Sequence, residues 1–509
     1  MEIFQWLLIL LVSAVLLTGC ARYLKLPYPS LLALGGVALA LLPNAPEFRL
    51  DPHLALALFV APVLLDSAYD TSLRDLKRYW VPVMCLVVIA VGITTFAVAW
   101  LVHSMVPGMP WAAAIALGAI VAPPDAAAAS AILRQLHIPH RMVVILEGES
   151  LLNDATALLV YRLAVSAAMG STFTSSVVGM QALAMLASIV AGFALAHFYV
   201  RAVARVTDVP SAIVLQFAGA FGVWILADES GLSAIVTIVA FAVTAARITP
   251  ERTPARMRLP SYAVWETVVF VLNVLAFVLI GLQLRPILDA LEPDTRTQYL
   301  QVAAAVLGVV VLVRIAWVMT YNRAAYLKQK WFGRGSWPGE YVPTLGGSAV
   351  VSWCGMRGIV TLAAAYALPD AFPFRELILL CAFCVVVGTL IVQGMTLRPL
   401  IKAMKLTADS TVDEEVHAAQ ARLAQIAAEI IDGDTSPTAH VLRDEFVTHH
   451  PTDADAATDS ARDERNRLRS RIVAAQRQAL VRMRATAEIG DDAFHRIEER
   501  LDWTEVNVR

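Results

Sequence analysis

The sequence predicts an all-α polytopic membrane protein that carries a hydrophilic tail. Of its 509 residues, 58% are hydrophobic and only 16% are charged, and the mean hydropathy is +0.64. Soluble proteins average roughly 45–50% apolar and about 25% charged residues, so this composition excludes an ordinary soluble enzyme and a disordered chain. A net charge of −2 gives no long-range attraction to polyanions, and we expect no nucleic-acid partner. Five cysteines exclude a disulfide scaffold.

Charged residues are unevenly distributed along the chain. Residues 406–509 contain 21 of the 42 acidic residues and 13 of the 40 basic residues, although they make up only a fifth of the length. Residues 1–405 have the composition of membrane-embedded protein. We therefore expect a transmembrane domain over 1–405 and a cytoplasmic C-terminal tail over 406–509.

About thirteen transmembrane helices are predicted in the first domain, because thirteen apolar segments alternate with short charged or Pro/Gly-rich breaks. A helix that crosses a bilayer needs about 20 apolar residues. Two of the segments, 29–43 and 53–69, are short enough to be buried or re-entrant instead. The thirteen lie at about 4–21, 29–43, 53–69, 80–105, 110–133, 142–168, 175–200, 210–227, 231–246, 261–283, 298–322, 343–367 and 376–397.

The basic residues between these segments predict the orientation. Twenty Lys and Arg residues fall in one set of alternate loops, and four fall in the other set. Cytoplasmic loops carry the excess of Lys and Arg. We therefore expect the N-terminus outside, the tail inside and an odd number of spans. The four residues expected outside are Arg49, Arg285, Arg296 and Arg375.

The first apolar segment has a competing interpretation. Leu17-Thr18-Gly19-Cys20 fits a lipoprotein cleavage box. However, Met1-Glu2 lacks the positive charge that a signal peptide needs before its apolar run. An uncleaved first helix is therefore favoured.

The tail is predicted to be partly helical. Residues 411–431 and 461–489 have apolar residues at helical spacing, and 432–460, rich in Asp, Thr, Pro and His, is predicted to be a linker. Two roles stay open for the tail. One is a solvated appendage that stabilises a dimer, and the other is regulation by pH or by an unknown ligand or protein.

A polar cluster interrupts the sixth span. Residues 146–154 read Leu-Glu-Gly-Glu-Ser-Leu-Leu-Asn-Asp. Ser150 and Asp154 are four residues apart and share a helical face, with Asn153 beside them. Hard cations prefer oxygen ligands. The cluster therefore predicts a cation site, and the alternative is a polar network that only holds helices together.

Two spans carry helix breakers at matching places. Pro123 and Pro124 precede Asp125 in the fifth span, and residues 352–358, Ser-Trp-Cys-Gly-Met-Arg-Gly, interrupt the twelfth span around Arg357. Proline removes a backbone donor and breaks a helix. Paired interruptions of this kind indicate the midplane site of a secondary transporter. Their spacing, seven spans apart and in opposite directions, predicts two inverted six-helix repeats.

Other charged residues inside spans are candidate functional residues because burial in a bilayer is costly. Asp66 lies near the cytoplasmic end of the third span, and a solvated helix-end acid is the alternative for it. Arg314 lies mid-span, and Glu149 is its candidate partner. Arg162 is interpreted as a structural pair or a side chain that reaches toward the outer surface.

These motifs resemble those of the sodium/proton exchanger branch of the cation–proton antiporters, the monovalent cation:proton antiporter-1 family. The resemblance covers residues 1–405 in order and spacing, and it is greatest to bacterial members with a long cytoplasmic tail. The motifs that carry it are 118–125, 146–155, 355–358 and 59–69.

The resemblance implies a homodimer in a bacterial cell (inner) membrane, with a mobile six-helix core in which two broken helices cross near Asp154. By this analogy Asp154 carries the ion and the proton. Asp125, Ser150 and Asp66 complete the Na⁺ site, with a backbone carbonyl near Pro124. The sequence departs from the family pattern at Asp66, where some members have Glu.

The same resemblance assigns the neighbouring residues. Asn153 marks the electroneutral type of exchanger, and electrogenic relatives carry a second aspartate there. Glu149 pairs with Arg314, and Arg357 supports the helix crossing.

We therefore expect a secondary transporter, not an enzyme, that exchanges cytoplasmic Na⁺ for external H⁺. The two ions compete for one buried site, because a ligand must lose its proton to bind the cation. Exchange is expected to be one for one, by alternating access, without ATP or a cofactor. Li⁺ and K⁺ remain open as the transported cation. A K⁺/H⁺ antiporter of the same fold, an ion channel and a non-transporting sensor are the alternatives.

Overall fold

The computed structural model describes residues 2–42, 51–133, 138–170, 175–332, 344–406, 409–434, 436, 439 and 459–507. Within these ranges all regular structure is helical, as predicted. Most of the predicted linker 432–460 lies outside the described residues, as do Arg49, Arg134 and Arg334 of the charge pattern.

The first half of the membrane-embedded part runs from α1 to α10. Two π-helical segments, η1 and η2, continue directly into α4 and α7. The elements are α1 (Glu2–Leu24), α2 (Tyr28–Ala40), α3 (Pro52–Ala55), η1 (Leu56–Val60), α4 (Ala61–Asp70), α5 (Leu73–Arg78), α6 (Trp80–Met84), η2 (Cys85–Ala90), α7 (Val91–Met105), α8 (Trp111–Val121), α9 (Ala126–Leu133) and α10 (His140–Ala168).

The second half runs from α11 to α19, and three helices of the tail follow it. The elements are α11 (Ser175–Val203), α12 (Val209–Glu229), α13 (Ala234–Arg252), α14 (Ala255–Leu282), α15 (Leu284–Asp289), α16 (Pro293–Phe332), α17 (Leu345–Trp353), α18 (Ile359–Tyr366), α19 (Arg375–Ala403), α20 (Thr411–Asp432), α22 (Asp459–Ala485) and α23 (Asp491–Asn507).

Each predicted apolar segment coincides with a helix or with an interrupted helix. Among the described residues, seven helices are long and apolar enough to cross a membrane, and four apolar helices are shorter. The short group includes α2, which has 13 residues and matches the short segment 29–43. The number of membrane crossings, thirteen, stays a prediction.

Two helices are broken where the sequence predicts. Residues 122–125 separate α8 from α9, and residues 354–358 separate α17 from α18. Pro123 and Pro124 account for the first break, because neither has a backbone N–H to continue the helix. The second break contains two glycines, Gly355 and Gly358.

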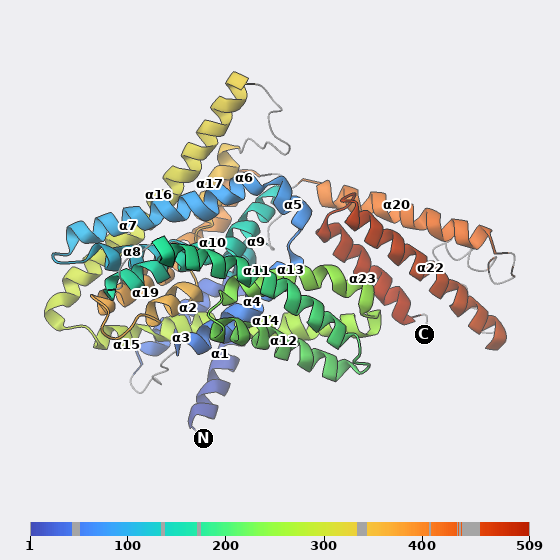
Figure 1. The fold of residues 1–509 in the computed structure, drawn as a ribbon, viewed down its shortest axis with the longest axis horizontal. Coiled ribbons are helices and arrows are strands. Elements are labelled where there is room, and N and C mark those ends of the chain that lie inside the picture. The colour runs from blue at the N-terminus through green and yellow to red at the C-terminus, as the bar shows by residue number, and fades with distance from the viewer. Residues whose placement is uncertain are drawn as a thin grey trace.

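The helices around the breaks pack into two bundles (Figure 1). We name α6–α10 with α16–α19 the core bundle, and α1–α4 with α11–α14 the second bundle. Close packing inside each bundle depends on glycine. A Cβ at Gly118 would lie 2.3 Å from the Thr95 carbonyl oxygen, where α8 meets α7, and a Cβ at Gly36 would lie 2.2 Å from that of Val278, where α2 meets α14.

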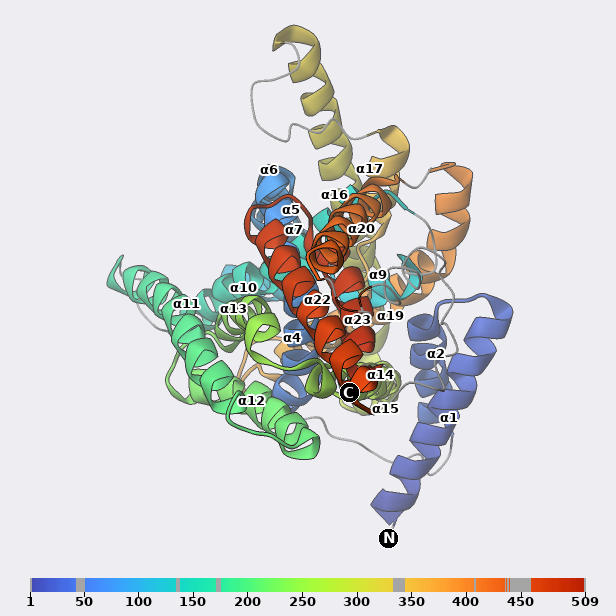
Figure 2. The same cartoon turned by 90° about the vertical axis from the view of Figure 1, so that its right-hand side faces the viewer.

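The tail helices α20, α22 and α23 lie at one end of the molecule, in front of both bundles when viewed from that end (Figures 1 and 2). They share an apolar cluster of their own, which includes Leu423, Leu480, Phe494 and Ile497. The two predicted tail helices are present as α20 and α22. The third helix, α23, was not predicted.

Candidate functional site

The two helix breaks touch each other at the middle of the core bundle. The Asp125 backbone N–H, at the first break, donates to the Met356 carbonyl, at the second, over 2.7 Å. The buried Arg357 guanidinium donates to the carbonyls of Val121 and Ala122, at 3.0 and 3.1 Å. These carbonyls end α8 and have no partner within a helix. Arg357 therefore places a positive charge at a helix C-terminus, where the helix dipole favours it.

Two glycines of the second break allow charged side chains to come close. A Cβ on Gly358 would lie 1.6 Å from Oδ2 of Asp125, a distance that no real contact permits. A Cβ on Gly355 would lie 2.5 Å from Cδ of Arg314. The break therefore needs glycine at both positions, so that one acid and one arginine can pack against bare backbone.

Glu149 of α10 and Arg314 of α16 form a buried ion pair beside the crossing. The guanidinium donates two hydrogen bonds to the carboxylate, at 2.5 and 2.8 Å, and the two residues are 1% and 3% exposed. Arg314 also donates to the Val351 carbonyl, 3.2 Å away in α17. Bidentate geometry makes this the strong kind of ion pair, and it ties three helices of the core bundle together.

The middle of α10 lies against the first break. Asn153 is fully buried, and its Nδ2 donates to the Pro124 carbonyl over 2.9 Å. Within the described part of the chain, Asn153 Oδ1 has no hydrogen-bond partner. Asp154 is 7% exposed, and its carboxylate lies near enough to Asp125 for the two charges to repel. Two carboxylates, one buried and one half-buried, thus lie near one amide oxygen, and oxygen ligands of this kind are those that hard cations prefer.

A cavity of about 290 Å³ leads from the first break to the tail. Its inner lining includes Pro124, Asp125 and Ser150, and its outer lining includes Asp413 and Asp492 of the tail helices. Water and small ions can therefore reach the residues around Asp125 from the side of the molecule on which the tail lies.

Asp66 does not line this cavity. It lines a separate cavity of about 120 Å³, together with Tyr69, Arg258 and Tyr262. No three His, Cys, Asp or Glu side chains among the described residues lie close enough to hold one metal ion. Asp154 and Asn153 do not line the first cavity either, but Asn153 bonds the Pro124 carbonyl and Asp154 lies near Asp125. The structure thus brings Asp154, Asp125, Asn153 and Pro124 together, with Ser150 beside Asp125 in the cavity lining, and a role for Asp66 in the cation site stays a prediction.

Several residues at the site were not predicted. Cys354 lines the cavity, and the hydroxyl of buried Thr389 accepts a hydrogen bond from the Arg357 backbone N–H at 3.0 Å. A threonine in an apolar helix carries no distinctive signal, because such hydroxyls usually bond their own helix, as Thr389 also does with the Val385 carbonyl. Only the three-dimensional crossing shows its second contact.

Comparison with known proteins places this geometry in a family. The family model described as "Sodium/hydrogen exchanger, transmembrane" matches residues 8–403. The "Sodium, potassium, lithium and rubidium/H⁺ antiporter" of Bacillus subtilis is 27% identical, over 99% of this chain and 78% of that protein. The uncharacterised Na⁺/H⁺ exchanger YjcE of Escherichia coli K12 is 29% identical, over 99% of this chain and 98% of that protein.

The fold has a solved counterpart. The structure of the sodium proton antiporter MjNhaP1 from Methanocaldococcus jannaschii at pH 8 superposes with a TM-score of 0.58 at 18% identity, covering 80% of this chain and all of that one. At that identity the match supports the fold alone. The family match spans nearly all of the two bundles and both helix breaks, and the chain therefore belongs to the sodium/hydrogen exchanger family of multi-pass membrane transporters.

Proposed function

We propose that this chain exchanges Na⁺ for H⁺ at a site centred on Asp154, with Asp125, Ser150 and the oxygens of Asn153 and Pro124 around it. The observation that carries the proposal is the meeting of buried Asp154 with half-buried Asp125 at the crossing of two broken helices. Broken helices at membrane depth are tolerated where they line protein or a wet cavity. Relatives whose names describe antiport or exchange of Na⁺ and H⁺ support the same two transported ions.

Competition between the two ions follows from the charges. Asp125 and Asp154 repel each other in a buried site, and a proton or a cation relieves that repulsion. A site that has bound a proton offers one ligand fewer to Na⁺, so binding of either ion opposes binding of the other. Glu149 is already neutralised by Arg314. Asn153 contributes an oxygen without charge, which favours electroneutral one-for-one exchange.

Alternating access would come from movement of the core bundle against the second bundle, with the crossing carried by the core. The cavity that reaches Asp125 from the tail side supports a cytoplasm-open arrangement, given a cytoplasmic tail. We place the N-terminus outside, the tail in the cytoplasm and the protein in the bacterial cell membrane. The family resemblance supports a homodimer.

The test is exchange in proteoliposomes that contain the full-length protein. A Na⁺ gradient should drive a pH change inside the vesicles without ATP, and Asp154→Asn should abolish it. Asp370→Asn, at a fully exposed loop position, is the matched control and should exchange like the wild type. Undiminished exchange by Asp154→Asn would refute the assignment of the carboxylate. Li⁺ or K⁺ in place of Na⁺ gives the ion preference in the same assay.

A further inference from the structure

One helix of the tail contacts both bundles. Asp492, near the start of α23, faces His140 at the start of α10 in the core bundle. Asp502, near the end of the same helix, faces Arg258 of α14 in the second bundle. Asp502 lies ten positions after Asp492, which corresponds to a helix length of about 15 Å. A rigid helix thus spans the boundary between two bodies whose relative movement transport requires.

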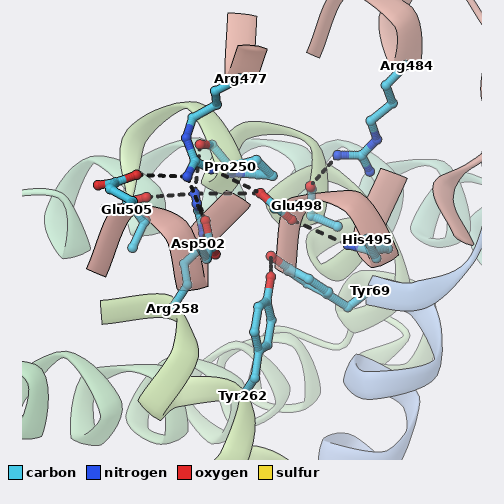
Figure 3. Close-up of polar contacts among 12 residues, drawn as sticks. Tyr69, Pro250, Arg258, Tyr262, Arg477, Arg484, His495, Glu498, Asp502 and Glu505 are labelled. Atoms are coloured by element: carbon cyan, nitrogen blue, oxygen red, sulfur yellow. Dashed lines mark hydrogen bonds and ion pairs between the residues drawn. The ribbon is translucent and has the colours of Figure 1, made fainter. Parts of the chain in front are cut away.

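The contact with the second bundle is buried and made by several charges (Figure 3). Arg258 is 3% exposed, and its guanidinium makes a two-point pair with Asp502, whose exposure is 0%. Arg258 also lies 3.6 Å from Glu498 and donates to the Pro250 and Thr253 carbonyls at the end of α13. Removing one partner of a buried ion pair strongly destabilises the folded arrangement, because the other charge stays buried without compensation. The tail is therefore held firmly at this end.

A further residue of the second bundle meets α23 beside this pair. The ring of Tyr69, at the end of α4, stacks on His495 with the centroids 6.2 Å apart. The Tyr69 hydroxyl lies 3.5 Å from that of Tyr262 in α14 (Figure 3). One face of α23 therefore follows the ends of two helices of the second bundle.

The contact with the core bundle is more exposed and centres on a histidine. The two ring nitrogens of His140 lie 3.2 Å from Asp75 of α5 and 3.2 Å from Asp492 of α23. The His140 backbone N–H donates to Asp409, which precedes α20, at 3.3 Å. When the imidazole is protonated, both ring nitrogens donate. The neutral ring can donate from only one of them, so it cannot satisfy both carboxylates.

A second contact reinforces the attachment beside the core bundle. Arg74 of α5 donates to Glu415 of α20 at 2.8 Å, and the other oxygen of Glu415 accepts the Gly490 backbone N–H at 2.7 Å. These two contacts hold three segments in one arrangement: α5, α20 and the turn that precedes α23. The tail is therefore attached on both sides of the boundary between the bundles.

We propose that the docked tail is a latch that holds the two bundles in the cytoplasm-open arrangement, and that release of α23 from either bundle speeds transport. The inference rests on the proposed function, because it needs movement of one bundle against the other. Contacts of α23 with both bundles oppose that movement. The cavity between the tail and the core, lined by Asp125 as well as Asp492, remains accessible in the latched state.

The experiment compares initial rates of Na⁺-driven proton exchange in proteoliposomes at pH 6.5. Asp502→Asn removes the two-point partner of Arg258 and leaves Glu498 at 3.6 Å; it also removes a partner of Arg477 in α22. Asp492→Asn removes the charge that faces His140, and the Asp492 side chain makes no ion pair within the described part of the tail. Both variants should exchange severalfold faster than the wild type, because each weakens the attachment of one end of α23. The side chain of Asp492 is 47% exposed, so this variant should fold even where Asp502→Asn does not.

Arg471→Gln provides the matched control. It breaks an ion pair of the same kind, with Asp434 at 3.4 Å, but that pair lies within the tail. Its rate should equal that of the wild type. The latch is refuted when the wild type exchanges and neither aspartate variant is faster, or when Arg471→Gln is faster by the same factor. A wild type that shows no exchange at all would instead refute the proposed function.

Discussion

At the scale of single residues, the core bundle depends on charges that are compensated pair by pair. Arg314 has Glu149 as its counter-ion, and Arg357 has the carbonyls at the end of α8. Each arginine is buried, and each is tied to a helix break. Asp125 and Asp154, the carboxylates that we propose for transport, lie close enough for their charges to repel. In this proposal the arginine-paired Glu149 has a structural role, and the two aspartates carry the exchanged charge.

Loss of one partner of the Glu149–Arg314 pair should destabilise the protein strongly. Glu149→Gln leaves the Arg314 guanidinium buried without a counter-ion, which costs about 3–5 kcal/mol in comparable pairs. Arg285→Gln breaks an exposed pair with Asp289 and should cost less than about 1 kcal/mol. Thermal unfolding of both variants in detergent measures the difference. Equal melting temperatures would show that the buried pair contributes no more than a surface pair.

At the scale of elements, the two broken helices depend on glycine where they cross. Gly358→Ala would place a methyl group 1.6 Å from the Asp125 carboxylate, so α18 must move away or Asp125 must turn. We expect Gly358→Ala to lose nearly all exchange. Gly308→Ala, in α16, meets nothing within 4 Å and should keep full activity, because alanine is about 1 kcal/mol better than glycine inside a helix. The readout is the exchange rate per folded protein in proteoliposomes.

The helices of the two bundles were predictable because apolar segments of bilayer length can be recognised from composition alone. Pro123, Pro124 and the glycines near Arg357 also marked both breaks correctly. The position of Asp66 was not predictable, since helical spacing does not say which of two neighbouring cavities a side chain lines. α23 was missed although Phe494, Ile497 and Leu501 are spaced for one buried helical face. Its strongly charged sequence hides that face, and only packing against α20 and α22 reveals it.

At the scale of the whole molecule, the proposed latch predicts that the tail makes ion transport respond to cytoplasmic pH. Arg258 was counted only as one of many loop arginines in the sequence, yet its partners come from a helix more than 200 residues later. Local sequence patterns cannot predict ion pairs between residues so far apart in the chain. Such pairs determine whether the tail is a separate appendage or is attached to the bundles that we propose to move.

The electrostatics of His140 give the latch a direction of response to pH. Burial alone lowers the pKa of His140, but the hydrogen bond to Asp75 and the charge of Asp492 outweigh burial and raise that pKa above the ordinary 6.5. Burial likewise raises the pKa of Asp75, but His140 and Arg74 bring it down to about 2, so Asp75 stays ionised near neutrality. A raised histidine pKa stabilises docking fully below pH 6.5, and this contribution is lost as pH rises through the raised value.

Docking of α23 should therefore weaken in the wild type as pH rises from 6 to 9, and exchange should accelerate over the same range. Hydrogen exchange of the α23 backbone amides measures docking, and the proteoliposome assay measures transport. His140→Gln cannot become charged, so its α23 amides should exchange rapidly already at pH 6, with little further change. His417→Gln, at an exposed position of α20, should keep the wild-type profile. Protection of α23 that does not vary with pH in the wild type would rule out His140 as the sensor, because no other contact described for α23 loses a positive charge in this range while facing the core bundle.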